Sequence, residues 1–153
     1  YRFDIHGPNG FFRMFRGNEN DPELSILLEY ERESGKRKQL TGNLLLSLMN
    51  PGDKKLIIEI TDNSYGAAKR TIELIPQQSN SLKSDSQQSN PPQFNSPQSK
   101  SVERIVLDSS SGWYDLSITV SGNKNFEKRY AGRVETGRHG LTDPLMGGVS
   151  GTA

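Results

Sequence analysis

The chain has 153 residues, enough for one domain and too few for two of ordinary size. It carries 19 basic and 18 acidic side chains, a net charge of +1, so it lacks the strong basic field expected of a nucleic-acid-binding protein. Cysteine is absent, which excludes disulfides, cysteine–zinc sites and thiol catalysis, and no apolar run approaches the roughly 18 residues of a membrane span.

Apolar residues recur with a period of two from the first residue, which predicts β-strands. Tyr1, Phe3 and Ile5 predict a half-buried first strand, a Gly-Pro-Asn-Gly turn follows it, and 11–16 resumes as a second strand. The chain opens inside this pattern without an initiator Met. We therefore expect a domain excised from a larger protein, with any targeting signal upstream.

The next two strands form a predicted hairpin around Ser34-Gly35. Opposing their apolar faces requires a three-residue loop, 34–36, with Glu33 facing Arg37 rather than Lys36. Burial of one face fixes register more firmly than exposed charges do, so we predict this longer loop. The resulting pairs are Tyr30 with Leu40, Ile26 with Leu44 and Leu24 with Leu46.

The remaining strands are predicted from the same alternation. They lie at 55–62, 69–75, 102–108, 114–120 and 126–134. Residues 77–100 are rich in Gln, Ser, Asn and Pro, and we interpret them as a mobile loop because so few apolar side chains cannot offset the entropy of ordering. A linker between two domains is the alternative, but only about three strands follow it, a poor basis for an independent core. We expect one domain over 1–137 and a loose tail over 138–153.

About nine short strands, with turns at regular spacing and no helical stretch, predict an all-β, antiparallel two-sheet sandwich. A barrel is the alternative. The sandwich is preferred because the strand faces alternate cleanly and nothing suggests a ligand-lined interior. The pair Trp113-Tyr114, at the entry to a late strand, fits an immunoglobulin- or fibronectin-like layout.

No catalytic constellation is visible in the sequence. The two imidazoles, His6 and His139, lie at a strand end and in a Gly-rich tail, where surface positions are expected. The carboxylates that border strands or turns, where Asp caps backbone amides, are Asp4, Asp62, Asp115 and Asp143. We predict no catalytic residue, no cofactor and no metal site. A polar cleft gathering His6, Asp115 and Asp143 would contradict this prediction.

One strand has aromatic and basic residues on both faces. The candidate interaction surface consists of Phe11, Phe12, Arg13 and Arg16. Burial of the strand on both sides is one interpretation, and exposure of an aromatic to a partner or to lipid headgroups is the other. We interpret Arg129, Arg133 and Arg138 as a solvated strand face, with docking onto a neighbouring domain as the alternative.

Several ordered motifs carry a family resemblance. They are YRFDIHGPNGF at 1–11, FRG at 15–17, LMNPG at 48–52, TDNSYG at 61–66, GWYDL at 112–116, and RYAGRVETG at 129–137 with TDP at 142–144. The chain resembles the C-terminal domain of bacterial phosphocholine-type, non-hemolytic phospholipases C. The similarity extends over nearly the whole chain except 77–100.

The resemblance implies a context and no catalytic residue. In that family a large α/β phosphoesterase domain precedes the C-terminal domain, holds the metal-dependent chemistry and hydrolyses phosphatidylcholine or sphingomyelin. The resemblance also implies export of the parent protein to the periplasm or the medium. The family motif residues, for which a structural role is expected, are Trp113, Tyr114, Asp115, Gly132, Arg133 and Glu135.

The leading hypothesis is a non-catalytic accessory module. Its expected partner is the upstream phosphoesterase domain of the same polypeptide, with a phospholipid surface as a second candidate and no nucleic acid. The alternative is a carbohydrate- or protein-binding sandwich, which needs an exposed aromatic platform, and Trp113 is the sole Trp. An autonomous phosphoesterase ranks lowest.

Overall fold

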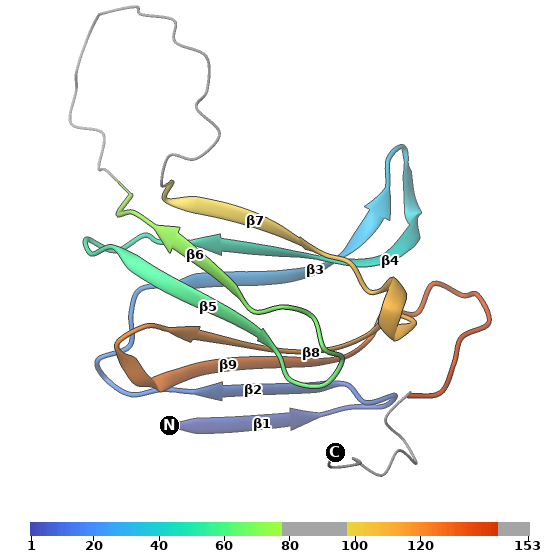
Figure 1. The fold of residues 1–153 in the computed structure, drawn as a ribbon, viewed down its shortest axis with the longest axis horizontal. Coiled ribbons are helices and arrows are strands. Elements are labelled where there is room, and N and C mark those ends of the chain that lie inside the picture. The colour runs from blue at the N-terminus through green and yellow to red at the C-terminus, as the bar shows by residue number, and fades with distance from the viewer. Residues whose placement is uncertain (78–97, 144–153) are drawn as a thin grey trace, which may run out of the picture.

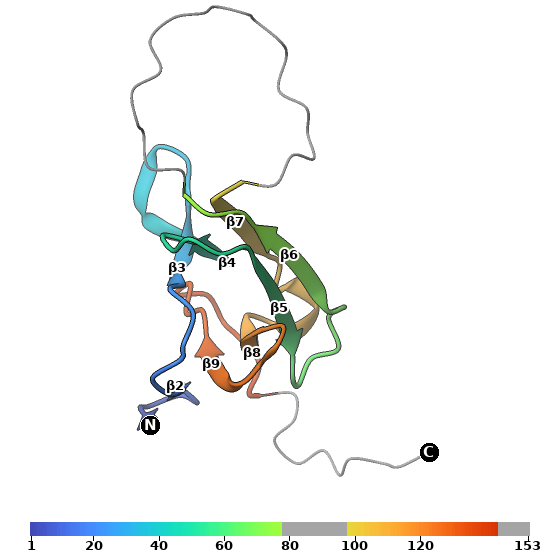
Figure 2. The ribbon, with the colours of Figure 1, turned by 90° about the vertical axis from the view of Figure 1, so that its left-hand side faces the viewer.

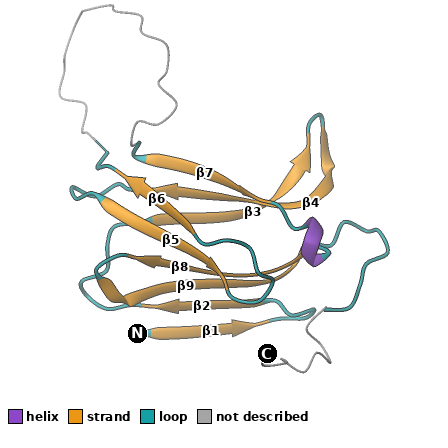
Figure 3. Ribbon diagram, viewed as in Figure 1, coloured by secondary structure: helices purple, strands orange, loops and turns teal. Residues whose placement is uncertain are grey.

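The computed structural model describes residues 1–77 and 98–143, which form nine β-strands and one turn of 3₁₀ helix (Figures 1 and 3). The elements are β1 (Arg2–His6), β2 (Phe12–Arg16), β3 (Ser25–Glu33), β4 (Lys36–Met49), β5 (Leu56–Asp62), β6 (Arg70–Leu74), β7 (Lys100–Ile105), η1 (Asp108–Ser110), β8 (Trp113–Val120) and β9 (Asn123–Arg133). The Gly-Pro-Asn-Gly turn is confirmed between β1 and β2, where Asn9 and Gly10 adopt positive φ angles of 54° and 70°.

The strands form two sheets. One has six strands in the order β1-β2-β9-β8-β5-β6, the other has three in the order β3-β4-β7, and the named strands pair antiparallel throughout. The sheets lie as two layers and do not close into a barrel, so the predicted all-β sandwich is confirmed (Figure 1). The finer immunoglobulin- or fibronectin-like layout stays a prediction.

The core lies between the inner faces of the two sheets. Leu44, Leu46 and Leu48 of β4 are fully buried, and they pack in one cluster with Ile58 of β5 and Ile118 of β8. These residues follow the period of two that the sequence shows, because alternate side chains of a strand point to the same face. Close packing of these central strands stabilises the domain.

The predicted register of the β3–β4 hairpin is wrong. Glu33 pairs with Lys36 across a two-residue loop, their side chains are 3.4 Å apart, and Gly35 in the loop has a φ of +74°. The apolar faces still oppose each other, with Ile26 paired with Leu48 instead of Leu44. The charge pair at the loop and the opposed apolar faces occur together because the register shifts twice along the hairpin.

These two irregularities lie between the loop and the core. Between the paired positions Arg32–Leu40 and Tyr30–Leu44, β4 advances by four residues and β3 by two. Between the pairs Glu33–Lys36 and Arg32–Leu40, β4 again advances by four residues and β3 by one. The extra residues of β4 are accommodated as bulges, which change the register without turning the apolar face to solvent.

The prediction of a half-buried first strand is also wrong. Every residue of β1 is exposed, and Tyr1, Phe3 and Ile5 are 53%, 61% and 51% exposed. β1 is the edge of the six-stranded sheet and lies beyond the strands of the smaller sheet (Figures 1 and 2). Its inner face therefore has no opposing layer, although its sequence alternates as a buried strand would.

Two sequence predictions lie largely outside the described residues. These are the low-complexity loop, of which 78–97 is not described, and positions 144–153 of the tail. In the described part of the tail, the carbonyl oxygen of Leu141 accepts a hydrogen bond of 3.2 Å from Trp113 Nε1. No described segment forms a helix of the length and hydrophobicity that crossing a membrane requires.

Candidate functional site

The candidate surface on β2 is divided between the two faces of its sheet. By register, Phe11 and Arg13 lie on the inner face and Phe12 and Arg16 on the outer face. The Phe12 ring lies 4.9 Å from the His6 imidazole and is half-buried. The four side chains therefore do not form one continuous surface.

The arginines of β2 are held by internal partners. Arg13 Nη1 donates hydrogen bonds of 2.8 Å to the carbonyl oxygens of Phe12 and Ala131, and Nη2 donates one of 3.0 Å to the Tyr114 hydroxyl. The same guanidinium lies 4.2 Å from the centre of the Phe11 ring. Arg16 forms an ion pair of 2.8 Å with Glu127. Both arginines thus contribute to packing between strands.

An exposed apolar surface lies beside β2 on the inner face of the sheet. We define the edge face as Tyr1, Phe3, Ile5 and Phe11, each of which is at least 36% exposed. The Tyr1 and Phe3 rings lie 5.6 Å apart, so part of this surface is continuous. Contiguous apolar side chains at a strand edge are typical of a surface covered by a partner.

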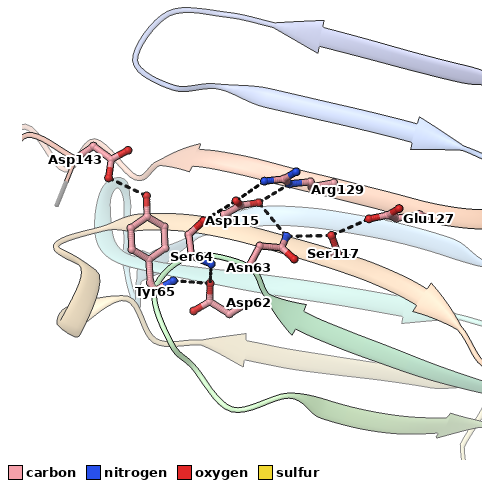
Figure 4. Close-up of polar contacts among 9 residues, drawn as sticks. All are labelled: Asp62, Asn63, Ser64, Tyr65, Asp115, Ser117, Glu127, Arg129 and Asp143. Atoms are coloured by element: carbon pink, nitrogen blue, oxygen red, sulfur yellow. Dashed lines mark hydrogen bonds and ion pairs between the residues drawn. The ribbon is translucent and has the colours of Figure 1, made fainter. Parts of the chain in front are cut away.

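The most extensive polar network of the six-stranded sheet surrounds Asp115 on β8 (Figure 4). Arg129 of β9 forms two hydrogen bonds to its carboxylate, from Nε at 2.7 Å and from Nη2 at 2.6 Å. Asn63 Nδ2 and Ser64 Oγ donate two more, at 3.1 and 2.8 Å. Because Asp115 is only 6% exposed, these donors replace the water that the carboxylate loses on burial.

The electrostatics of this network keep Asp115 charged. Burial acts to raise its pKa, but the hydrogen bonds from Arg129, Asn63 and Ser64 outweigh burial and lower the pKa below its ordinary value. An ionised carboxylate with a bidentate Arg partner is a poor general base, since its proton affinity is reduced. The arrangement ties the 63–65 loop to two strands.

The loop after β5 is held by Asp62 at its start and by a hydrogen bond from Tyr65 to Asp143. Asp62 accepts hydrogen bonds of 3.0 Å from the backbone amides of Ser64 and Tyr65, which is the capping role predicted for it. The Tyr65 hydroxyl donates a hydrogen bond of 3.2 Å to Asp143. Burial, followed by the negative charge of Asp143, raises the pKa of Tyr65 above its ordinary value.

The family motif residues of β8 and β9 lie together on neighbouring strands. Tyr114 is buried, and burial with the hydrogen bond to Tyr30 raises its pKa to about 12. Gly132 opposes it with a φ of +152°, and a Cβ there would lie 3.0 Å from the Tyr114 hydroxyl, so glycine lets the two strands approach. Trp113 is 9% exposed.

The last two motif residues border this pair of strands. The Arg133 guanidinium lies 5.6 Å from the centre of the Trp113 ring, a cation–π distance. Glu135 Oε1 accepts a hydrogen bond of 2.6 Å from Asn9 Nδ2, which joins the β1–β2 turn to the end of β9. All six motif residues thus lie on β8, β9 or the segment that follows.

Of the titratable residues singled out in the sequence, Asp62, Asp115 and Asp143 each accept hydrogen bonds from the 63–65 loop, and the others lie in separate environments. His6 contacts Phe12, Asp4 forms an ion pair with Arg2, and Asp143 accepts from Tyr65. His139 lies in the segment after β9 and is exposed. Within 1–77 and 98–143, no group of three or more His, Asp or Glu side chains could hold a metal ion.

Two of the site's polar contacts were not predicted. Arg129 has a side chain that is 39% exposed, as expected of a solvated strand face, but the sequence does not predict that it pairs there with a buried carboxylate. A signal was available, since Asp115 occupies the middle of an otherwise apolar motif and a buried charge requires a partner. Nothing in the alternation pattern indicated the contact of Tyr65 with Asp143, because both lie in loops.

Comparison with known proteins gives a consistent result. The family model described as "Bacterial phospholipase C, C-terminal domain" matches residues 24–133. A non-hemolytic phospholipase C of Pseudomonas aeruginosa is 32% identical to the chain, over 96% of the chain and 18% of that protein. A hemolytic phospholipase C of the same organism is 36% identical over 95% and 17%, and a non-hemolytic phospholipase C of Burkholderia pseudomallei is 32% identical over 95% and 18%. The chain thus spans less than a fifth of the length of these relatives.

Proposed function

Because the chain belongs to the family of bacterial phospholipase C C-terminal domains, we propose that it is a non-catalytic accessory module that docks on the phosphoesterase domain of a longer polypeptide. The relatives are more than five times as long as the stretch matched here, so a large part of such a polypeptide lies outside this chain. By the same resemblance, the proposed location is the periplasm or the medium.

The edge face is the observation that carries this proposal. Tyr1, Phe3 and Ile5 are each more than half exposed, although they share the inner face of a sheet whose strands β5, β8 and β9 supply buried core residues on that face. Covering the exposed halves of these three side chains would contribute roughly 2–4 kcal/mol to docking. A folded domain of the same polypeptide is held close to this face at high effective concentration, so even a modest contact would form.

The polar side chains support a non-catalytic role. Asp115 is charged and held by Arg129, and Asp143 is held by Tyr65, so neither carboxylate is free to act as a base. A catalytic site needs a nucleophile, a base and a stabilising donor within reach of one reacting atom. Incubation of this chain with phosphatidylcholine vesicles should give no phosphocholine release above buffer.

Contact with a phospholipid surface is a second proposed role of this module. Its best support is Phe11, which is 36% exposed beside the cationic Arg13. Vesicle co-sedimentation of the chain, compared with that of a Phe11→Ala variant, tests this contact, and equal binding of the two would exclude Phe11 from it. The carbohydrate-binding alternative loses its aromatic platform, because Trp113 is only 9% exposed and is covered by Arg133.

Hydrogen exchange tests the docking proposal directly. The β1 amides should exchange at least about tenfold more slowly in the full-length polypeptide than in the isolated 153-residue chain, because docking removes solvent from the edge face. Phe3→Ser in the full-length polypeptide should abolish this difference. The matched control is Val102→Ser on β7, a residue that is 54% exposed and lies outside the edge face.

Equal exchange of β1 in the two forms would refute docking through this face. So would equal effects of the two substitutions, because they would show a general loss of stability. Melting of each isolated variant chain separates the two causes, since Phe3→Ser removes an exposed side chain and should leave the chain's own stability within about 0.5 kcal/mol.

A further inference from the structure

Arg133 differs from the other arginines of its sheet in its partners. Arg13, Arg16 and Arg129 each donate hydrogen bonds to, or pair with, protein oxygens. The Arg133 guanidinium has no hydrogen bond or ion pair to any residue that the structure describes, and its Nε, like that of Arg16, is shielded from solvent without a partner. Within 1–77 and 98–143, its contact of defined geometry is a cation–π contact with the Trp113 ring. A shielded Nε–H without a protein partner is unusual, because buried donors are normally satisfied.

Arg133 lines a cavity of about 430 Å³ between η1 and the segment that follows β9. Two further cationic or donor side chains, Arg138 and His139, line the same cavity, as does one carboxylate, Asp108. Leu107 and Leu141 supply apolar lining. This cavity includes no residue of the edge face.

The segment after β9 fits closely against the guanidinium. A Cβ at Gly140 would overlap Nη2 of Arg133, so glycine at this position allows the chain to pass over the arginine. Trp113 Nε1 is bonded to the carbonyl oxygen of Leu141, which holds the same segment from the other side. The guanidinium therefore lies between an aromatic ring and the backbone of this segment, which limits its freedom before any ligand binds.

We propose that this cavity binds a phosphate-type oxyanion carried on an organic group. A guanidinium presents a planar fork of donors that matches phosphate geometry, and a second guanidinium and an imidazole line the same space. The volume exceeds that of a bare ion, and the leucines offer a surface for an organic substituent. The oxyanion comes from a soluble phosphate ester or from a phospholipid headgroup.

Trp113 provides an intrinsic reporter, because it is the sole Trp of the sequence and lies against Arg133. Titration of the 153-residue chain with glycerol phosphate, at constant ionic strength, should change its fluorescence with a dissociation constant on the order of 1–10 mM. Arg133→Met should weaken binding about tenfold or more, since charged hydrogen bonds to the anion are lost. Asp108→Asn should strengthen it, because the opposing charge is removed.

Two variants make the test specific. Lys124→Gln removes the same charge from an exposed position of β9 outside the cavity and should leave the affinity within about twofold. Gly140→Ala keeps the charge but displaces the guanidinium, and it should weaken binding at least about fivefold. The affinity of each variant for glycerol phosphate can also be measured by calorimetry, which does not depend on Trp113 fluorescence.

The source of the phosphate is resolved with vesicles of phosphatidylcholine containing phosphatidic acid. Co-sedimentation that depends on Arg133 identifies a headgroup, and binding of glycerol phosphate without co-sedimentation identifies a soluble ester. No saturable signal with glycerol phosphate up to about 50 mM would overturn the proposal. Equal losses in Arg133→Met and Lys124→Gln would overturn it as well, because they would indicate non-specific attraction.

Discussion

Asp115 is a buried carboxylate whose hydrogen-bond partners come from a neighbouring strand and from a loop. Its side chain is buried, whereas 39% of the Arg129 side chain is exposed, so the pair is buried on one side only. The guanidinium, Asn63 and Ser64 together occupy the carboxylate oxygens. The functional meaning of the residue is the attachment of a loop to the sheet.

Asp115→Asn should destabilise the chain by about 2 kcal/mol at pH 7, because it removes the charge that Arg129 and the other donors stabilise. This loss is smaller than that expected for a fully buried ion pair, because water screens the exposed side of Arg129. Asp4→Asn is the matched control. Its pair with Arg2 is exposed, and the change should have an effect below about 0.5 kcal/mol.

The effect of Asp115→Asn should depend on pH with a defined sign. The folded-state pKa of Asp115 is lowered, so the carboxylate's contribution is complete above the unfolded pKa of about 3.9 and is lost as the pH falls through the folded value. Urea unfolding at pH 7, 5 and 3 should show a constant gap between the original chain and the variant at the two higher values, and a smaller gap at pH 3. A gap that is the same at all three would show that the charge is not responsible.

At the scale of elements, the β3–β4 hairpin satisfies two preferences that the sequence sets against each other. The exposed pair Glu33 and Lys36 forms at the loop, and the apolar faces oppose each other further along the strands. Bulges in β4 reconcile them. Gly42 lies in the first of these irregular stretches and has a φ of +100°, which side-chain-bearing residues rarely adopt.

Gly42→Ala should therefore destabilise the chain by about 1–2 kcal/mol, because alanine is strained at this φ. Gly35→Asn is the matched control. Gly35 has a φ of +74°, with no atom within 4 Å of an added Cβ, and Asn tolerates the left-handed region, so its effect should stay below about 0.5 kcal/mol. Urea unfolding of both variants measures the difference. If the two variants unfold at the same midpoint, the bulge does not need a glycine.

The strands were predictable and the loops between them less so. Alternation identified each of the nine strands, because burial of one face imposes a period of two on the side chains themselves. Register needs more, since the bulges of β4 depend on how the backbone departs from regular pairing. The partner of Asp115 was missed for a related reason: Arg129 meets it only after β8 and β9 pair, and the sequence does not state which strands are neighbours.

At the scale of the whole molecule, the two sheets differ in the number of their strands. This difference explains why the prediction that β1 is half-buried is wrong, and it also motivates the proposed docking. Six strands face three, so the outermost strand of the larger sheet extends past its cover. The alternation of Tyr1, Phe3 and Ile5 correctly indicated a face suited to burial, but it could not indicate whether the covering surface belongs to this chain. A sequence pattern records that a face is apolar, not what covers it.

The order of strands also predicts how the molecule responds to a cut in the undescribed segment 78–97. Residues before it supply β1 to β6, and residues after it supply β7 to β9. β9 lies between β2 and β8, β8 pairs with β5, and β7 pairs with β4, so each sheet contains strands from both sides of the cut. A single domain over 1–137 therefore requires that the two fragments remain associated.

We expect a chain with a specific protease site inserted within 78–97 to elute as one species after cleavage, at the volume of the uncut chain. The fragments should separate only in denaturant, and the isolated first fragment should lose its β-strand circular dichroism, because the larger sheet is then without its two central strands, β9 and β8. The uncut chain with the same insertion controls for the insertion itself. Fragments that separate in native buffer, each retaining strand structure, would instead establish 77–100 as a linker between two domains. Two fragments can separate in this way only if each has its own core and they share no sheet.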